Sequence, residues 1–159
     1  MIGSSIHVND AQDRSLPADL PERIRTAVHV TLTAGRVDGP APETTEVSVT
    51  LVAAADMRDL NRRFHEVDAP TDVLAFGLKA AEGTPTPESA APGLLGDIYV
   101  CPDVASESAA EHGERVEDEI LRLAIHGTLH LLGHDHPEGE DRYDSEMFRV
   151  QERLLETLR

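Results

Sequence analysis

The sequence predicts an α+β fold in which a small sheet of about four strands packs with about five helices. Three observations lead to this prediction. Apolar residues recur at every second position in some segments, as in strands, and every three to four positions in others, as in helices. The order of these segments places helices over a small sheet. Residues 114–132 become apolar on nearly every side in their second half, which predicts a central buried helix.

The individual elements follow from local patterns. Val47, Val49 and Leu51 alternate with polar residues, as in a half-buried strand. Leu20 and Ile24 begin a series at helical spacing, and the prolines near its start are tolerated there. The expected strands are residues 5–10, 46–54, 72–76 and 94–102, and the expected helices are residues 16–34, 56–64, 103–111, 114–132 and 145–158.

Two segments receive more specific expectations. In the helix 56–64, Asp56 is expected to cap the first turn, with Met57, Leu60 and Phe64 facing inward. Residues 78–93 are poor in apolar side chains and contain three prolines, which predicts a mobile loop inside one domain that spans residues 1–159.

Length and composition narrow the class of protein. A chain of 159 residues is long enough for one core, and aromatic residues are only 3%, so the core is expected to consist of Leu, Val, Ile and Ala. No run approaches the roughly 18 apolar residues of a membrane span, and the N-terminus lacks a signal-peptide pattern. Cys101 is the single cysteine, which excludes an intramolecular disulfide. We expect a cytoplasmic protein that does not bind membranes.

The charge is strongly negative. Fourteen Lys and Arg against 30 Asp and Glu give a net charge of −16. Nucleic-acid-binding proteins normally present a basic face, because neutralising phosphates releases counterions. A general acidic adaptation of the surface explains such a composition equally well. Binding of a polyanion would therefore depend on a local patch.

The strongest chemical signal is the run 126–136, HGTLHLLGHDH. His126 and His130 are four residues apart, so both imidazoles lie on one face of a helix. Gly133 permits the left-handed backbone that ends a helix, and the turn after it can bring His136 back toward the other two. Three imidazoles without a fourth protein ligand describe a site for one zinc ion plus water. The alternative is that these histidines only cap and pack a buried helix.

The same spacing, H-x-x-x-H-x-x-G-x-x-H, belongs to the metzincin zinc proteases, which carry a glutamate general base directly after the first histidine. Here that position is Gly127, which has no proton acceptor. The ligand pattern of a zinc protease is therefore present without its base. A protease would need a base from elsewhere, such as Glu138, Glu140 or Asp141.

The run 126–136 also resembles the signature H-G-x-L-H-L-x-G-[YH]-D-H of the YbeY family, the bacterial metal-dependent endoribonucleases and rRNA maturation factors. Residues 70–76, PTDVLAF, resemble the family segment P-T-[DN]-V-L-S-F, and residues 94–101 resemble its L-L-G-D-I stretch. The resemblance covers residues 46–159 well and the segment before them only loosely.

This resemblance implies an endoribonuclease that cuts single-stranded RNA in rRNA maturation and ribosome quality control. It implies ribosomal RNA, the ribosome and ribosome-associated proteins as partners, and no DNA. For the site, it implies that His126, His130 and His136 bind zinc. Asp135 lies between potential ligands and is expected to accept the N–H of one of them.

One position departs from the family pattern. The family generally carries an arginine, important for RNA cleavage, where this chain has His65. His65 holds a phosphate only when it is protonated. Arg62 and Arg63 are the expected substitutes, stabilising charge on the phosphorus. Alternatively, these arginines form a solvated helix face with Asp59 and Glu66 as partners.

Two other functions stay open on the sequence alone. One is a zinc metalloprotease with an unusual base. The other is a non-enzymatic ribosome-assembly factor whose metal only stabilises the fold, and both the acidic charge and His65 favour this reading.

Overall fold

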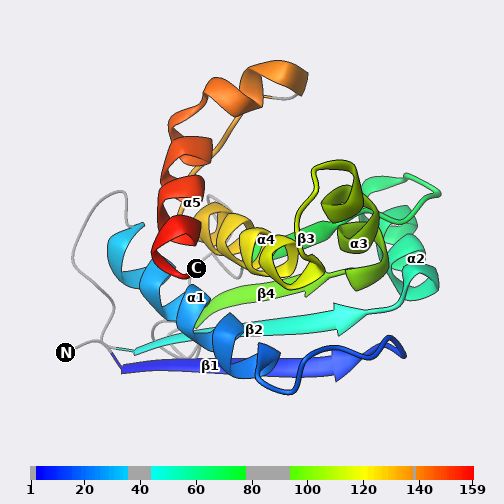
Figure 1. Ribbon diagram of the computed structural model, residues 1–159, viewed down its shortest axis with the longest axis horizontal. Coiled ribbons are helices and arrows are strands. Elements are labelled where there is room, and N and C mark those ends of the chain that lie inside the picture. The colour runs from blue at the N-terminus through cyan, green and yellow to red at the C-terminus, as the bar shows by residue number, and fades with distance from the viewer. Residues whose placement is uncertain (1–2, 36–43, 78–93, 138) are drawn as a thin grey trace, which may run out of the picture.

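A single four-stranded sheet organises the chain, as the computed structural model shows for residues 3–35, 44–77, 94–137 and 139–159. The strand order is β1-β2-β4-β3, with β1, β2 and β4 parallel and β3 antiparallel to β4. Helices cover the sheet (Figure 1), which confirms the predicted α+β class. In chain order, the elements are β1 (Gly3–Ala11), α1 (Leu20–Ala34), β2 (Thr44–Val52), α2 (Ala54–His65), β3 (Val73–Gly77), β4 (Leu94–Val100), α3 (Pro102–Glu111), α4 (Val116–Leu131), η1 (Gly139–Asp144) and α5 (Glu146–Thr157).

The expected mobile loop at residues 78–93 lies outside the described residues. The two strands that flank this segment, β3 and β4, pair with each other. Of the helices in the described ranges, none combines the length and apolar character that a membrane crossing needs.

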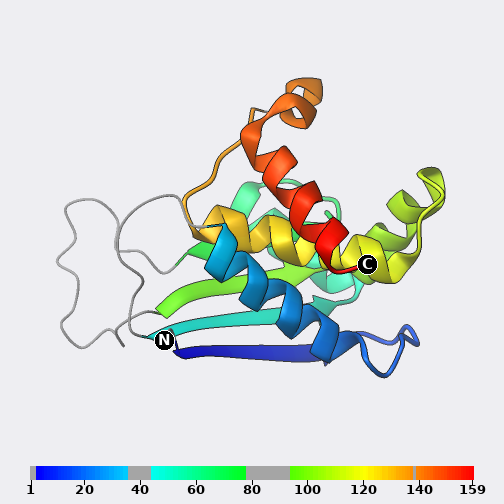
Figure 2. The same ribbon diagram turned by 60° about the vertical axis from the view of Figure 1, so that its left-hand side comes forward.

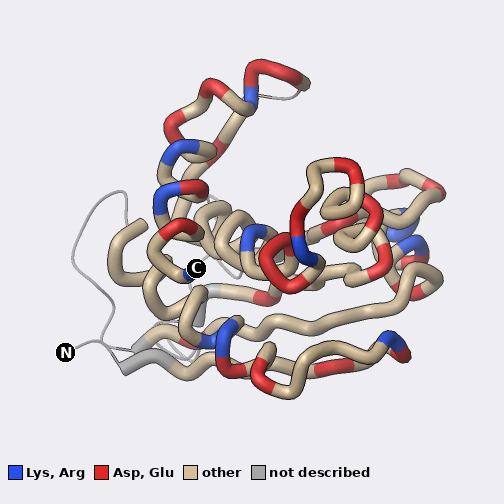
Figure 3. The backbone as a smooth tube through the Cα atoms, viewed as in Figure 1, with Lys and Arg blue, Asp and Glu red and all other residues tan. Residues whose placement is uncertain are grey.

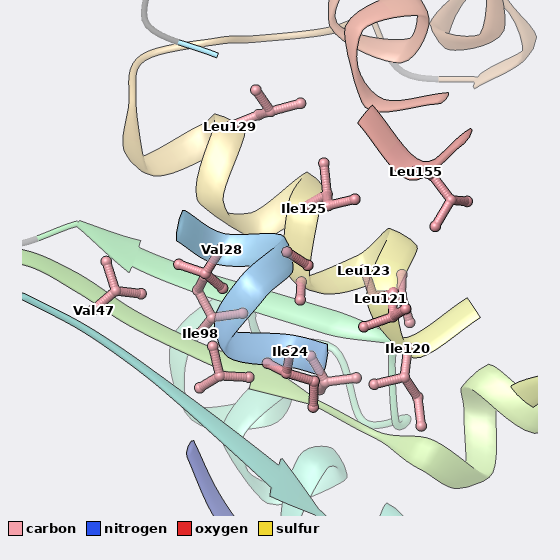
Figure 4. Packing of buried hydrophobic residues seen from close by; sticks show 14 of the residues in the cluster. Ile24, Val28, Val47, Ile98, Ile120, Leu121, Leu123, Ile125, Leu129 and Leu155 are labelled. Carbon is pink, nitrogen blue, oxygen red and sulfur yellow. The ribbon is translucent and has the colours of Figure 1, made fainter. Parts of the chain in front are cut away.

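The main core lies between one face of the sheet and the helices α1 and α4. Val47 and Val49 of β2 and Ile98 of β4 are fully buried on this face. Figure 4 shows Ile24 and Val28 of α1 close to these strands, with side chains of α4 beside them. The alternation read from the sequence therefore identifies the inward face of β2 correctly.

Helix α4 is the central helix of the fold. It packs against α1, α3 and α5 as well as β3 and β4, which confirms the predicted buried helix (Figures 1 and 2). At Gly127 the helix comes so close to the sheet that an added Cβ would lie 2.8 Å from Cγ2 of Ile98. Position 127 therefore faces the strand and has no room for a side chain. This contact fixes the rotation of α4 about its axis.

Helix α2 covers a smaller core, and two predictions made for this helix are wrong. Met57 is buried as expected, but Phe64 is 55% exposed and the prediction that it faces inward is wrong. Its ring contacts Phe76 of β3, with 4.9 Å between the ring centroids. Because β3 is an edge strand of the sheet, no further strand of the described chain lies beside it to cover the rest of the Phe64 ring. Asp56 does not cap α2 either, because the helix begins at Ala54.

The Gly127 contact can be tested by adding the missing methyl group. We expect Gly127→Ala to lower the free energy of unfolding by about 1–3 kcal/mol, since the stiff, β-branched Ile98 cannot move aside without strain. Urea denaturation gives the measurement. In an Ile98→Ala background the same change should cost less, and the double-mutant cycle isolates the contact. A Gly127→Ala variant at least as stable as the wild type would contradict this view, since alanine in place of a helical glycine in open space raises stability by about 1 kcal/mol.

Candidate metal centre

The end of α4 is shaped by a glycine that reverses the chain. Gly133 has φ of 102°, a left-handed conformation that favours glycine. Its N–H donates to the carbonyl of His130 at 3.0 Å, and the N–H of His134 donates to the carbonyl of Leu129 at 3.0 Å. This pair of bonds is the Schellman motif, which ends a helix and turns the chain back. The predicted stop signal is thus confirmed, and it leads His136 back to the helix.

Three imidazoles meet at this turn. The ligand atoms of His126, His130 and His136 all lie within 4.8 Å of one another. Nε2 of His126 and Nε2 of His130 are 3.1 Å apart. Two nitrogens bound to one tetrahedral zinc ion at its usual bond length stand about 3.3 Å apart. The spacing of the two helical ligands therefore fits a single ion, as the four-residue interval predicts.

The other ring nitrogens fix the form of each imidazole. Nδ1 of His126 lies 2.7 Å from Oε1 of Gln151, Nδ1 of His130 lies 3.2 Å from the carbonyl of His134, and Nδ1 of His136 lies 2.9 Å from the carbonyl of Pro137. All three partners are acceptors, so each Nδ1 carries the proton and donates. Each Nε2 is then left with a lone pair. Lone pairs of His126 and His130 that face each other at 3.1 Å are the arrangement that a shared cation stabilises.

Burial keeps the two helical histidines neutral. Loss of hydration lowers the pKa of His126 to about 4, against a smaller opposing effect of the hydrogen bond to Gln151. Burial also lowers the pKa of His130, and the neighbouring His136 adds to the effect. Both rings are therefore neutral at pH 7, which is the form that binds metals.

Gln151 is held in turn by a charged cluster. Its Nε2 donates to Oε2 of Glu152 at 3.1 Å, which orients Oε1 toward His126. Glu152 accepts from Nε of Arg122 at 2.9 Å. Arg122 also pairs with Glu114, at 2.9 Å from Nη2 to Oε1, and with the buried Glu119. A polar chain thus runs from a three-carboxylate cluster on one arginine to the first candidate ligand. Arg122 thus serves to satisfy nearby carboxylates.

A pocket of about 480 Å³ opens beside the histidines. His126 and His136 line it from one side, and Arg142, Tyr143 and Phe148 line it from η1 and α5. The sequence did not identify Arg142 and Tyr143 as pocket residues, because the loop after His136 has no periodicity. The one available signal is that Arg142 is the only basic residue in the acidic run 137–146.

The other predicted site residues lie outside this pocket lining. Arg62, Arg63 and His65 are on the exposed end of α2, and no residue of α2 lines the pocket among the described residues. Asp59 lies within ion-pair distance of both arginines, at 2.6 Å from Arg62 and 3.8 Å from Arg63. The alternative of a solvated helix face with Asp59 as partner therefore matches the geometry. A role of these residues in RNA cleavage stays a prediction.

Asp135 is near the centre but does not make the expected contact. Its Oδ1 accepts from the backbone N–H of His136 at 2.9 Å, and no ring N–H donates to it among the described residues. The carbonyl of His134 takes that place on His130. The His134 ring itself bonds to the carbonyl of Gly35 at the end of α1, so it braces the turn. Asp135 affects His130 only through its charge.

The fold and this three-histidine group define the class first, as an α+β protein with a candidate metal centre that opens on a pocket. The chain belongs to the YbeY family, since the family model described as Endoribonuclease YbeY matches residues 7–159.

Individual relatives agree with this membership. A protein named Endoribonuclease YbeY from Micrococcus luteus is 46% identical over 114 residues, which are 71% of this chain and 70% of the relative. One of the same name from Nocardia farcinica is 41% identical over 141 residues, 87% of this chain and 73% of the relative. A third, from Mycobacterium ulcerans, is 44% identical over 113 residues, 70% and 62% of the two chains. A solution structure from Thermotoga maritima is 30% identical, with a TM-score of 0.61 over 97% of this chain and 89% of that one.

The hydrogen bond from His126 to Gln151 predicts a measurable effect on metal binding. Gln151→Met keeps the length of the side chain but removes the acceptor that fixes the tautomer of His126. We expect a loss of about 10–100-fold in affinity for zinc, measured by competition with a chromogenic chelator. Gln12→Met, in the loop after β1, should leave the affinity unchanged. Equal zinc affinity in the Gln151→Met variant and the wild type would contradict the role of Gln151 in orienting His126 for metal binding.

The Arg122 cluster predicts a pH-dependent loss of stability. The hydrogen bond from Arg122 lowers the pKa of Glu114, so in the wild type this pair contributes stability above the usual carboxyl pKa, and the contribution is lost as the pH falls. Arg122→Met leaves three carboxylates without their main cation, and we expect it to cost about 3 kcal/mol at pH 7.

As the pH falls, the carboxylates of the variant take up protons, beginning with Glu119, whose pKa is raised by burial, so the difference from the wild type should shrink. Urea denaturation at several pH values measures both curves. Arg153→Met, a change at an exposed arginine of α5, is the matched control and should cost little at any pH. If the difference in the free energy of unfolding between Arg122→Met and the wild type does not change with pH, the cluster does not contribute to stability through these charges.

Proposed function

We propose that this chain is a zinc-dependent endoribonuclease that cuts single-stranded ribosomal RNA. The observation that carries the proposal is the group of three imidazoles whose ligand atoms lie within 4.8 Å of one another beside an open pocket, in a member of a family whose relatives are named endoribonucleases. Ribosome association, in maturation and quality control, is part of the same proposal and rests on the family alone.

In this proposal His126, His130 and His136 would hold one zinc ion. Imidazole nitrogen in a three-ligand set with an open position is typical of catalytic zinc. The ion would lower the pKa of water and polarise a phosphoryl oxygen as a Lewis acid. Gln151, with the carbonyls of His134 and Pro137, keeps the three rings in the ligating tautomer. The pocket beside them supplies space for a strand of RNA.

The close contact at Gly127 weighs against the protease alternative. A general base at this position would have to point into the pocket, but position 127 faces Ile98 in the core. Of the candidate bases named for that alternative, Glu140 and Asp141 do not line the pocket beside the histidines, and position 138 lies outside the described residues.

The proposal is tested with metal-loaded protein incubated with single-stranded RNA and, separately, with casein. We expect cuts in the RNA and none in casein, and we expect His130→Ala to reduce RNA cleavage to the level of chelator-treated protein. His7→Ala, which removes a half-exposed histidine of β1, is the matched control and should cleave like the wild type. Mass spectrometry of the dialysed protein identifies the retained metal.

Three other results would replace the proposal. Cleavage of casein that His130→Ala abolishes would favour a protease. Intact RNA, together with a sharp fall in the melting temperature of His130→Ala, would favour an assembly factor with a structural metal. RNA cleavage that is equal in His130→Ala and wild type would indicate a contaminating ribonuclease.

A further inference from the structure

The pocket beside the histidines contains two arginines in opposite electrostatic situations. Arg122 forms ion pairs with Glu114, Glu119 and Glu152, so its positive charge is neutralised within the protein. Arg142 lines the same pocket from η1 and is exposed. No carboxylate among the described residues lies within ion-pair distance of its guanidinium; the acceptor it uses is the hydroxyl of Tyr143 at 2.6 Å.

Arg142 and Tyr143 form a cation and aromatic pair at the pocket edge. The guanidinium carbon lies 4.8 Å from the centroid of the Tyr143 ring. The same ring contacts Phe148 edge to face, at 5.3 Å between centroids and 90° between planes. Tyr143 is nevertheless 49% exposed, so much of this residue remains accessible from solvent. An aromatic ring next to a guanidinium is the usual means of binding a stacked base and its phosphate.

The charge of the surroundings makes Arg142 more important. The chain carries −16, and acidic residues lie on helices, strands and turns alike (Figure 3). The pocket lining includes four carboxylates, those of Asp72, Glu114, Glu119 and Glu152. These carboxylates repel the phosphates of an RNA strand that enters the pocket, so a cation without a carboxylate partner is needed to hold the strand there.

The arginines of α2 do not offer the same free charge. Arg58 pairs with Asp68, at 2.8 Å from Nε to Oδ1, and Arg62 and Arg63 share Asp59. None of them lines the pocket in the described part of the chain. At position 65, where an arginine is expected from the family pattern, this chain has histidine.

We propose that Arg142 and Tyr143 form the RNA-binding edge of the pocket, with Arg142 contacting a backbone phosphate beside the cleaved one and Tyr143 stacking on a base. The proposal rests on the proposed endoribonuclease function and names the residues by which an acidic chain holds its RNA. Both residues bind substrate, and neither takes part in bond cleavage.

The test measures binding separately from cleavage. A short, fluorescein-labelled, single-stranded 2′-O-methyl oligonucleotide is titrated with metal-loaded protein by fluorescence anisotropy at several salt concentrations, and steady-state kinetics are measured on the unmodified RNA. The variants are Arg142→Ala, Arg142→Lys, Tyr143→Ala and Tyr143→Phe. Arg153→Ala removes an equal charge from α5, outside the pocket lining, and is the matched control.

We expect Arg142→Ala to weaken binding about tenfold, because a charged hydrogen bond to phosphate is lost. The slope of log affinity against log salt should become about 0.7 less negative, as for one phosphate contact to a single strand. KM should rise while kcat stays near the wild-type value, and Arg142→Lys should restore the salt slope. Tyr143→Ala should weaken binding about tenfold, with Tyr143→Phe close to wild type. Arg153→Ala should change neither affinity nor slope.

The outcomes separate this inference from the proposed function. If Arg142→Ala and Arg153→Ala behave alike while the wild type cleaves RNA, the inference is overturned and the function stands. If the wild type binds the oligonucleotide through Arg142 but cleaves no RNA, the RNA contact stands and the nuclease function is overturned. A wild type that binds no oligonucleotide overturns the inference as well. A lower kcat in Arg142→Ala with unchanged KM and salt slope also overturns it.

Discussion

The direct contact between Gly127 of α4 and Ile98 of β4 is the constraint on which the rest of the structure depends. Because no side chain separates helix from strand, the sheet sets the rotation of α4 about its axis. His126 immediately precedes Gly127 on the helix, and its ring is thereby directed to Gln151 on α5. His130, one turn later, falls on the same side, with its Nε2 close to that of His126. A contact inside the apolar core therefore determines where two metal-binding nitrogens point.

A chain of hydrogen bonds from Arg122 through Glu152 and Gln151 also orients the ring of His126. Glu114 precedes α4 and Glu119 lies in its first turn, and both pair with the guanidinium of Arg122, so the cluster joins the first half of α4 to Glu152 of α5. Its cost is that one of the two arginines in the pocket lining has no charge to offer a substrate. In the proposed function, this acidic pocket would rely on the ion that the histidines would hold and on the other arginine of its lining.

Local rules account for what the sequence predicted well. The spacing of His126 and His130, the stop at Gly133 and the alternation in β2 each depend on a few consecutive residues, and each appears as expected. The strand order, with β4 inserted between β2 and β3, could not be predicted, because pairing over long separations leaves no local pattern. Phe64 was misassigned for the same reason: its helical position is inward, but only the sheet order reveals that an edge strand lies beneath it. Arg142 was not predicted because the loop that carries it has no periodicity.

The three candidate ligands differ in how the fold supports them. His126 and His130 belong to the central helix, whereas His136 lies on the turn beyond it, where among the described residues its Nδ1 is bonded to the carbonyl of the next residue. Core substitutions therefore act on the stability of the domain and on the placement of two candidate ligands together, whereas turn substitutions act on the third. Evolution can thus adjust the third position without loss of stability, but a shift of the first two requires the core to be repacked.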